Sequence, residues 1–341
     1  MYTYGVIDGR FVESVKISDA SLVRVVNDRL EQVKTYCPQD FARKLINIEK
    51  HGKFKATEQR QLLFYTAPVI FSGIVNPAVH QHLLLLHASM RIMANPYFLN
   101  TEYVAFAERC IKLFVETASD VYGVEFLSFN THTLLHLADD VRAFGALDSF
   151  SAFPYENNMS YCRKLCRKPS QHLQQIANRR AENCHTTASK FIDPRSLKFI
   201  GNHARGPAPS IDGSTDYDQF RKVVAGAVHL SVLLPDSTVC LKNTSIGVIQ
   251  NVIRYNGSCH LLLKTFKDKV ENLFNRPCDS SLIGVYLCSI MSTETIVVSI
   301  DEVSDKCFRM PYWPAAVDAP AATNSNSFAV FKIMSTHFET E

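Results

Sequence analysis

The sequence lacks an apolar run long enough to cross a membrane. Its most apolar stretch, HLLLLHASMRIMA from His82 to Ala94, contains His87 and Arg91 and is far shorter than the roughly 20 residues that a transmembrane helix needs. The first residues, MYTYGVIDGR, also lack the apolar core of a signal peptide. We therefore expect no membrane partner and a location inside the cell, in the nucleus or the cytoplasm.

Closely spaced cysteines and the common nucleotide-binding motifs are absent too. The ten cysteines are scattered along the chain, unlike a secreted disulfide framework, so we expect reduced thiols. The patterns GxxxxGK[ST], GxGxxG and GxSxG do not occur. This gives no support to P-loop hydrolysis, dinucleotide binding or α/β-hydrolase chemistry, and we expect no small-molecule cofactor.

The sequence also lacks a large excess of either sign of charge, because the net charge is only +3. That value is too small to identify a polyanionic partner, so the local distribution of charge matters more. The composition, 46% hydrophobic and 20% charged over 341 residues, is typical of a folded globular protein. The length suits about two domains.

Apolar spacing in the first half of the chain predicts helices. In the stretch from Ser18 to Tyr36, apolar side chains recur every three or four residues. The pair Asn76-Pro77 is typical of a helix start and Gly145 of a helix end. We expect five or six helices up to about Cys184.

The second half predicts strands. The stretch GNHARGPAPSIDGSTD, Gly201 to Asp216, is rich in glycine, proline, serine and aspartate and indicates a linker or long loop. Short β-branched or alternating runs follow from Gly226, and Asn256-Gly257 between two of them is typical of a two-residue hairpin turn. About six short strands in so little sequence favour a small barrel.

The predicted fold class is therefore α+β, with a mostly helical N-terminal region followed by a small β-barrel-like domain. The expected divisions are an N-terminal extension at 1–17, a helical domain at 18–195, a linker at 196–217, a β-rich domain at 218–312 and a disordered tail at 313–341.

A basic segment is the strongest indication of a polyanionic partner. No acidic residue occurs between Asn157 and Ala181. The cations in this segment are Arg163, Lys164, Arg167, Lys168, Arg179 and Arg180. Arg163 and Arg167 are four residues apart, as are Lys164 and Lys168, so on one helix they would form a stripe able to contact DNA phosphates. A solvated helix face would contain the same residues.

Glu156, directly before the basic segment, has two interpretations. It is a candidate catalytic acid, but a carboxylate at a helix start is also favoured by the helix dipole. Two-metal catalysis needs several carboxylates from different elements. The nearby candidates are His132, His136, Asp139, Asp140 and Asp148.

His132, His136 and Asp140 have the spacing of metal ligands on one helix face, yet the HExxH pattern of zinc hydrolases is missing. These residues have an alternative role as polar groups that tie helices together. We therefore predict no bound metal for this chain by itself.

Several segments, in order and with matching spacing, resemble the C-terminal half of EnSpm/CACTA-type transposases. They are PQDFARKL (38–45), FKATEQRQLLFYTAPVI (54–70), HLLLLHASMRIM (82–93), YGVEFLSFNTHTLLHLADDVRAFGALDSFSAFPYENN (122–158) and CRKLCRKP (162–169). The resemblance extends from about Val25 to Arg180, and Ala146 and Tyr155 depart from the family pattern GPLDSFSAFPFEN. A weaker match from Val228 to Pro311 looks like the small β-rich domain that follows in such transposases.

The resemblance implies part of an RNase H-like catalytic fold, in which two aspartates and a glutamate hold two Mg²⁺ or Mn²⁺ ions for DNA strand cleavage and transfer. Glu156 matches the glutamate. In the family, the two aspartates belong to strands of a preceding segment, and the stretch before Val25 is too short to contain those strands. We therefore expect no independent transposase activity.

Three hypotheses follow. The first is a transposable-element-derived protein that is catalytically incomplete and retains DNA or protein binding. The second is an active nuclease or transposase subunit, completed by another transposase chain that supplies the aspartates. The third is a chromatin-associated adaptor that acts through the β-rich domain.

Overall fold

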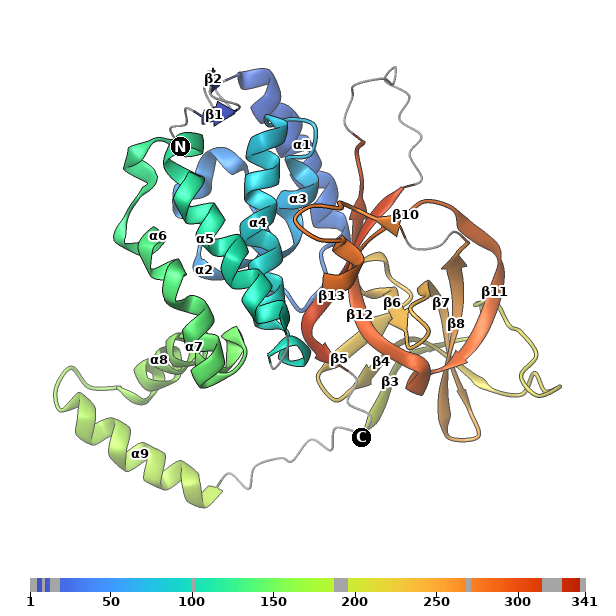
Figure 1. The fold of residues 1–341 in the computed structure, drawn as a ribbon. Helices are drawn as coiled ribbons and strands as arrows, with labels where there is room; N and C mark the ends of the chain where they lie inside the picture. Colours follow the sequence, from blue (N-terminus) through green and yellow to red (C-terminus); the bar gives the residue numbers. More distant parts are fainter. Residues whose placement is uncertain are drawn as a thin grey trace.

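A layer of helices packs against one face of a curved antiparallel sheet in the computed structural model (Figure 1). The structure describes residues 5–7, 10–12, 19–99, 102–186, 196–267, 271–314 and 327–337. In this part of the chain, no helix combines the length and the apolar character that crossing a bilayer requires. The α+β class with a helical first half is confirmed.

The helical half begins with a short hairpin, β1 (Gly5–Ile7) and β2 (Arg10–Val12). The described α-helices are α1 (Ala20–Tyr36), α2 (Ala56–Gln61), α3 (Ala67–Ile70), α4 (Pro77–Ala94), α5 (Glu102–Tyr122), α6 (Phe129–Thr133), α7 (Leu137–Phe144), α8 (Phe153–Leu165) and α9 (His172–Thr186). Short 3₁₀ segments connect them at η1 (Ile48–Lys53), η3 (Pro96–Phe98), η4 (Val124–Phe126), η5 (Leu134–His136) and η6 (Leu147–Phe150).

Capping residues set the ends of several helices. The Asp19 carboxylate accepts a hydrogen bond from the Ser21 N–H at the start of α1 (2.7 Å), and Asn76 does the same for Ala78 at the start of α4 (2.9 Å). Gly145 follows α7 with a φ of 93°, a backbone conformation that favours glycine. The predicted starts and ends at Asn76-Pro77 and Gly145 are confirmed.

A π-helical segment, η2 (Leu62–Thr66), joins α2 to α3. Its wider turn leaves backbone carbonyls available to other partners. The Leu63 carbonyl accepts from Nδ1 of His87 (2.7 Å), and the Phe64 carbonyl accepts from Arg91 (3.1 Å). Both donors come from α4, so the π-turn fixes α4 against α2 and α3.

The C-terminal half forms an 11-stranded sheet in which every described strand pair is antiparallel. Its strands are β3 (Leu197–His203), β4 (Asp218–Ala225), β5 (Val228–Ser231), β6 (Thr238–Leu241), β7 (Ile246–Tyr255), β8 (Ser258–Phe266), β9 (Glu271–Asn272), β10 (Val285–Cys288), β11 (Met291–Ser299), β12 (Val303–Pro311) and β13 (Phe328–His337). The main path runs β11-β8-β7-β6-β12-β13-β10-β9, and β4 joins β3 and β5 to β7. Between strands lie the 3₁₀ segments η7 (Leu234–Asp236), η8 (Ser280–Ile283) and η9 (Ile300–Glu302).

The turn between β7 and β8 is the predicted hairpin. Asn256 and Gly257 have φ values of 50° and 79°, as a type I′ turn requires at both central positions. The expected turn at Asn256-Gly257 is confirmed.

The sheet curls without closing into a barrel. Phe266 of β8 and Phe328 of β13 are separated by three strands in the sheet order, yet their ring centroids are only 6.2 Å apart. The inner face also carries Cys240, Cys307 and Tyr286, which share a buried cluster with these rings. The expected barrel is wrong, because β11 and β9 end the path without pairing to each other.

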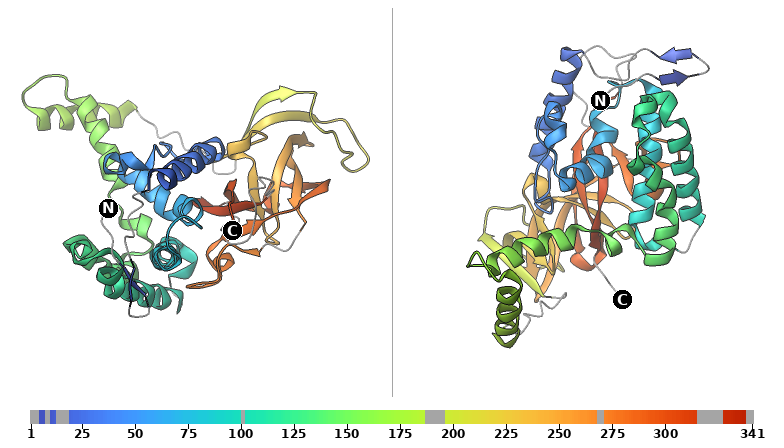
Figure 2. Two further views of the ribbon diagram at one scale, coloured as in Figure 1. Left: turned by 90° about the horizontal axis from the view of Figure 1, so that it is seen from above. Right: turned by 90° about the vertical axis from the view of Figure 1, so that its left-hand side faces the viewer.

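The other face of the sheet belongs to the same core as the helices. Val26 and Leu30 of α1 share a buried cluster with Phe308 of β12 and Phe331 of β13. Figure 2 shows the helical layer against these strands from two further directions. The helices and the sheet therefore stabilise each other by burying one shared apolar surface.

Two of the predicted divisions need correction. The expected linker at 196–217 contains β3, whose residues pair with β4 across Leu197–His203. The expected tail at 313–341 contains β13, which pairs with β12 and β10. Trp313, the first residue of that range, lies under the Arg29 guanidinium, 5.0 Å from the ring centroid. Residues 315–326 and 338–341 of the expected tail, and the expected N-terminal extension apart from β1 and β2, lie outside the described residues.

Two buried histidines make stability depend on pH. His82 donates from Nε2 to the Phe114 carbonyl (3.0 Å), so its neutral Nδ1 accepts from the Tyr122 hydroxyl (3.0 Å). Burial lowers the pKa of His82 to about 4, and burial with the nearby Arg91 charge lowers the pKa of His87 to about 3. Both side chains are therefore neutral in the folded protein at pH 5 and above.

The unfolded chain takes up more protons than the folded chain below pH 6.5, the ordinary histidine pKa. The free energy of unfolding is therefore highest above about pH 6.5, and it falls as the pH is lowered from there towards the pKa values of the folded state. We expect each histidine to lower the free energy of unfolding by about 2 kcal/mol at pH 5 relative to pH 7.5. Urea unfolding at both pH values measures this difference.

Replacing His82 or His87 by glutamine should remove about that much of the pH dependence, whereas the exposed His51, replaced in the same way, serves as the control. An equally steep pH dependence in His82→Gln and His87→Gln would contradict the assignment.

Candidate nucleic-acid interface

The helices α8 and α9 form an arm, residues Phe153–Thr186, that extends away from the rest of the molecule in Figure 1 and in the left view of Figure 2. Pro154 stands in the first turn of α8, where its fixed φ suits a helix start. Large apolar side chains on the arm remain exposed, including Tyr155 at 74% and Leu173 at 84%. The arm therefore presents most of its surface to solvent.

The predicted basic residues all lie on this arm. Arg163 and Lys164 occupy the last turn of α8, Arg167 and Lys168 follow it, and Arg179 and Arg180 lie in α9. Arg179 is half-buried, and the other five are exposed. The single helical stripe is corrected, because α8 ends at Leu165 and its C-cap residue Cys166 has extended backbone angles. Arg167 and Lys168 belong to the loop between the helices.

Gln175 of α9 holds this loop in place. Its Oε1 accepts hydrogen bonds from the backbone N–H groups of Arg167 (2.8 Å) and Lys168 (3.0 Å), and its Nε2 donates to the carbonyls of Lys168 (3.0 Å) and Ser170 (2.6 Å). The backbone polar groups of the loop are thus bound internally. The side chains of Arg167 and Lys168 remain exposed.

Between Asn157 and Ala181, the central part of the arm carries only basic formal charges. Across the part of the chain that the structure describes, none of the six basic side chains forms an ion pair. Arg163 and Lys164 also interact favourably with the C-terminal end of the α8 dipole. That interaction leaves their charges accessible to a ligand, and two helices and a loop together present positive charge on one projection.

Glu156 lies in the first turn of α8 and is exposed. Its N–H donates to the Ala152 carbonyl (3.0 Å), which is the ordinary hydrogen bond of a helix start. A carboxylate here is stabilised by the helix dipole. Both interpretations of Glu156 therefore stay open.

The expected neighbours of Glu156 have other contacts. Asp148 accepts two hydrogen bonds from Arg60, including one of 2.8 Å from Nη2, and Asp139 pairs with Arg142 (2.8 Å). The exposed rings of His132 and His136 lie 5.3 Å apart, edge to face.

Asp140 is exposed one turn further on. Among the residues that the structure describes, no three histidine, cysteine, aspartate or glutamate side chains come together as a metal-binding group.

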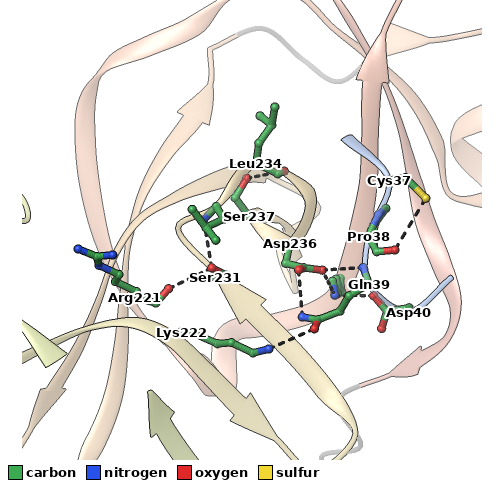
Figure 3. Close-up of polar contacts among 12 residues, drawn as sticks. Cys37, Pro38, Gln39, Asp40, Arg221, Lys222, Ser231, Leu234, Asp236 and Ser237 are labelled. Carbon is green, nitrogen blue, oxygen red and sulfur yellow. Dashed lines mark hydrogen bonds and ion pairs between the residues drawn. The ribbon is translucent and has the colours of Figure 1, made fainter. Parts of the chain in front are cut away.

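Sequence reasoning missed a second concentration of charge, which is buried. Nζ of Lys306 in β12, with a fully buried side chain, contacts Asp236 (2.7 Å) and Asp40. Gln39 adds two hydrogen bonds to Asp236, from its backbone N–H (3.2 Å) and from Nε2 (3.0 Å), and accepts one from Lys222 (3.2 Å). Figure 3 shows the contacts that Gln39, in the segment after α1, makes with Asp236 of η7 and Lys222 of β4. This network joins the two layers.

Comparison with known proteins gives one partial match. Residues 202–331 match a family model described as a domain of unknown function, DUF8592. No curated protein and no solved structure matches the chain. The matched residues run from β3 to β13, so they cover the sheet and leave out the helices and the arm.

Proposed function

We propose that this protein is a transposase-derived DNA-binding protein that contacts DNA phosphates through the α8–α9 arm. The observation that carries the proposal is the grouping of six cations on one projecting element, with no acidic residue from Asn157 to Ala181. Phosphate contacts by lysine and arginine supply most of non-specific DNA affinity. The exposed aromatic ring of Tyr155, at the start of α8, is available for stacking with a base.

The proposed origin rests on the resemblance to the C-terminal half of CACTA-type transposases, whose most specific segment ends at the start of α8. In this proposal the helical half corresponds to part of an RNase H-like core, and Glu156 is the remnant of its final acid. The family's DNA cleavage would need the two aspartates of the preceding segment with Mg²⁺ or Mn²⁺. DNA binding implies a nuclear location.

The test is an electrophoretic mobility shift with labelled duplex DNA. If four to six phosphates are neutralised, affinity should fall by about 100- to 1,000-fold between about 50 and about 200 mM salt. The fourfold variant Arg163→Gln, Lys164→Gln, Arg167→Gln, Lys168→Gln should weaken binding by about 100-fold at the lower salt concentration and flatten the salt dependence.

A matched control removes the same number and kind of charges elsewhere. Arg24, Arg43, Lys50 and Lys53 are exposed and form no ion pair with a described residue. Changing all four to glutamine lowers the net charge equally, so it should alter affinity by less than about threefold if contacts on the arm dominate. Equal losses in the two variants, or binding that salt does not weaken, would overturn the proposal.

A further inference from the structure

The inner face of the curled sheet contains a buried arginine, Arg309 of β12. Only 6% of its surface is exposed. Its guanidinium lies against the ring of Phe328 at 4.8 Å and the ring of Tyr36 at 5.8 Å, measured to the centroids. Tyr36 ends α1 and Phe328 begins β13, so the guanidinium lies where the helical layer meets the curl of the sheet.

Arg309 forms no ion pair with any described residue, and its Nε is buried there without a hydrogen-bond partner. The other buried cations differ in this respect. Lys306 contacts two carboxylates, and Arg91 donates to backbone carbonyls. Arg309 is therefore an exception to the rule that buried charges are paired.

Burial lowers the pKa of Arg309, and the nearby Tyr36 and Cys288 oppose that effect. An arginine nevertheless remains protonated under all ordinary conditions. The two aromatic faces attract its charge, but they cannot accept the in-plane N–H groups as a carboxylate does. Among the described residues, this positive charge thus has no carboxylate partner, and its Nε has no acceptor.

The cation on the neighbouring strand is already neutralised. Lys332 lies two residues further along β13 from Val330, the cross-strand partner of Arg309, and its Nζ contacts Asp305 at 2.6 Å. A ligand at Arg309 therefore meets a single unpaired guanidinium and an apolar surface made by Phe328, Val330 and Cys288. This combination suits a singly charged anion with an apolar body better than a dianion.

We propose that the inner face of the sheet at Arg309 is a binding site for a small monocarboxylate. The planar fork of the guanidinium would bind the two carboxylate oxygens, and Phe328 and Tyr36 would contact the apolar remainder. This site is separate from the α8–α9 arm and does not depend on DNA binding.

The experiment is thermal unfolding of the full chain in chloride, sulfate, formate, acetate and benzoate at equal ionic strength. Carboxylate binding only to the folded state should raise the Tm by about 2 °C at a concentration about ten times the Kd. Arg309→Met should remove this increase, and in chloride it should unfold at the same temperature as the wild type or higher, because it eliminates an unpaired buried charge.

Arg254→Met is the matched control. Arg254 also lies against two aromatic rings, those of Phe199 and Phe220, but it is paired with Asp218 at 2.7 Å. Its variant should keep the full response to carboxylates. If carboxylates raise the Tm of Arg309→Met as much as that of the wild type, the proposal of a binding site at Arg309 is wrong.

Two other results would also overturn the proposal. One is the absence of a response in the wild type to all three carboxylates. The other is a difference in Tm between the wild type and Arg309→Met that is larger in sulfate than in any carboxylate, because the site would then bind a dianion.

Discussion

Replacing Arg91 by leucine should lower the free energy of unfolding by about 4 kcal/mol. The fully buried guanidinium donates to the carbonyls of Phe64 (3.1 Å), Ile283 (3.0 Å) and Lys332 (3.1 Å), with a longer contact to Gly284 (3.5 Å). These acceptors belong to the π-turn, the segment before β10 and β13. Leucine would leave them buried without donors, at about 1–3 kcal/mol each, partly offset because no charge is buried.

The matched control is Arg29→Leu. Arg29 also donates to three carbonyls, those of Val69, Ile70 and Ser72, but it is only half-buried, so water can replace it. We expect a loss of about 1 kcal/mol. Urea unfolding followed by circular dichroism measures both variants. Equal decreases in the free energy of unfolding would show that burial of Arg91 does not increase the cost of its loss. A decrease below about 1 kcal/mol in Arg91→Leu would contradict the role of Arg91 in joining the helices to the sheet.

Replacing Lys306 by methionine should cost about 3–5 kcal/mol. The loss arises because Asp40 and Asp236, with side chains only 17% and 11% exposed, keep their negative charges without the cation between them. The attraction within an intact buried ion pair is largely cancelled by the cost of desolvating its charges. The loss of stability therefore comes from leaving the two carboxylates without a cation, and not from a large net contribution of the intact ion pairs.

A triple variant separates these two contributions. Lys306→Met with Asp40→Asn and Asp236→Asn removes all three charges, and the amide oxygen that replaces the Asp236 carboxylate can still accept from Gln39. This variant should recover at least half of the loss. The surface pair Lys34–Glu31 provides the control, since Lys34→Met should change stability by less than about 1 kcal/mol. If the triple variant is no more stable than Lys306→Met, charge imbalance is not the cause.

The regular elements with clear apolar periodicity were predictable from sequence. Val26, Leu30 and Val33 of α1 are buried as their spacing indicates, and the β7–β8 hairpin follows from alternation around Asn256-Gly257. These elements bury ordinary apolar side chains on one face. The apolar periodicity of these segments therefore predicts which of their faces is buried.

The strand β12 could not be recognised because its charged residues are inside. Asp305, Lys306 and Arg309 would indicate an exposed segment by sequence, yet all three are buried. Lys306 pairs with Asp40 and Asp236, which are distant from it along the chain. No local sequence pattern therefore predicts these partners. Charged side chains enter a core only with tertiary partners or ligands, which a single sequence does not display.

The candidate DNA-binding residues were found from composition, but their arrangement was not. The absence of acidic residues around Arg163 was visible in the sequence. The end of α8 at Leu165 and the folding of the following loop around Gln175 depend on hydrogen bonds between residues seven or eight positions apart. Helical spacing arguments do not anticipate such contacts.

The position of β13 has a consequence for biosynthesis. This strand comes last among the described elements, yet it lies in the interior of the sheet, between β12 and β10. Until the ribosome has released Phe328–His337, both neighbouring strands present an open edge, and the apolar faces of α1 and α4 lack part of the surface that they cover. The sheet is therefore incomplete until β13 is available, and its exposed edges favour assistance from chaperones.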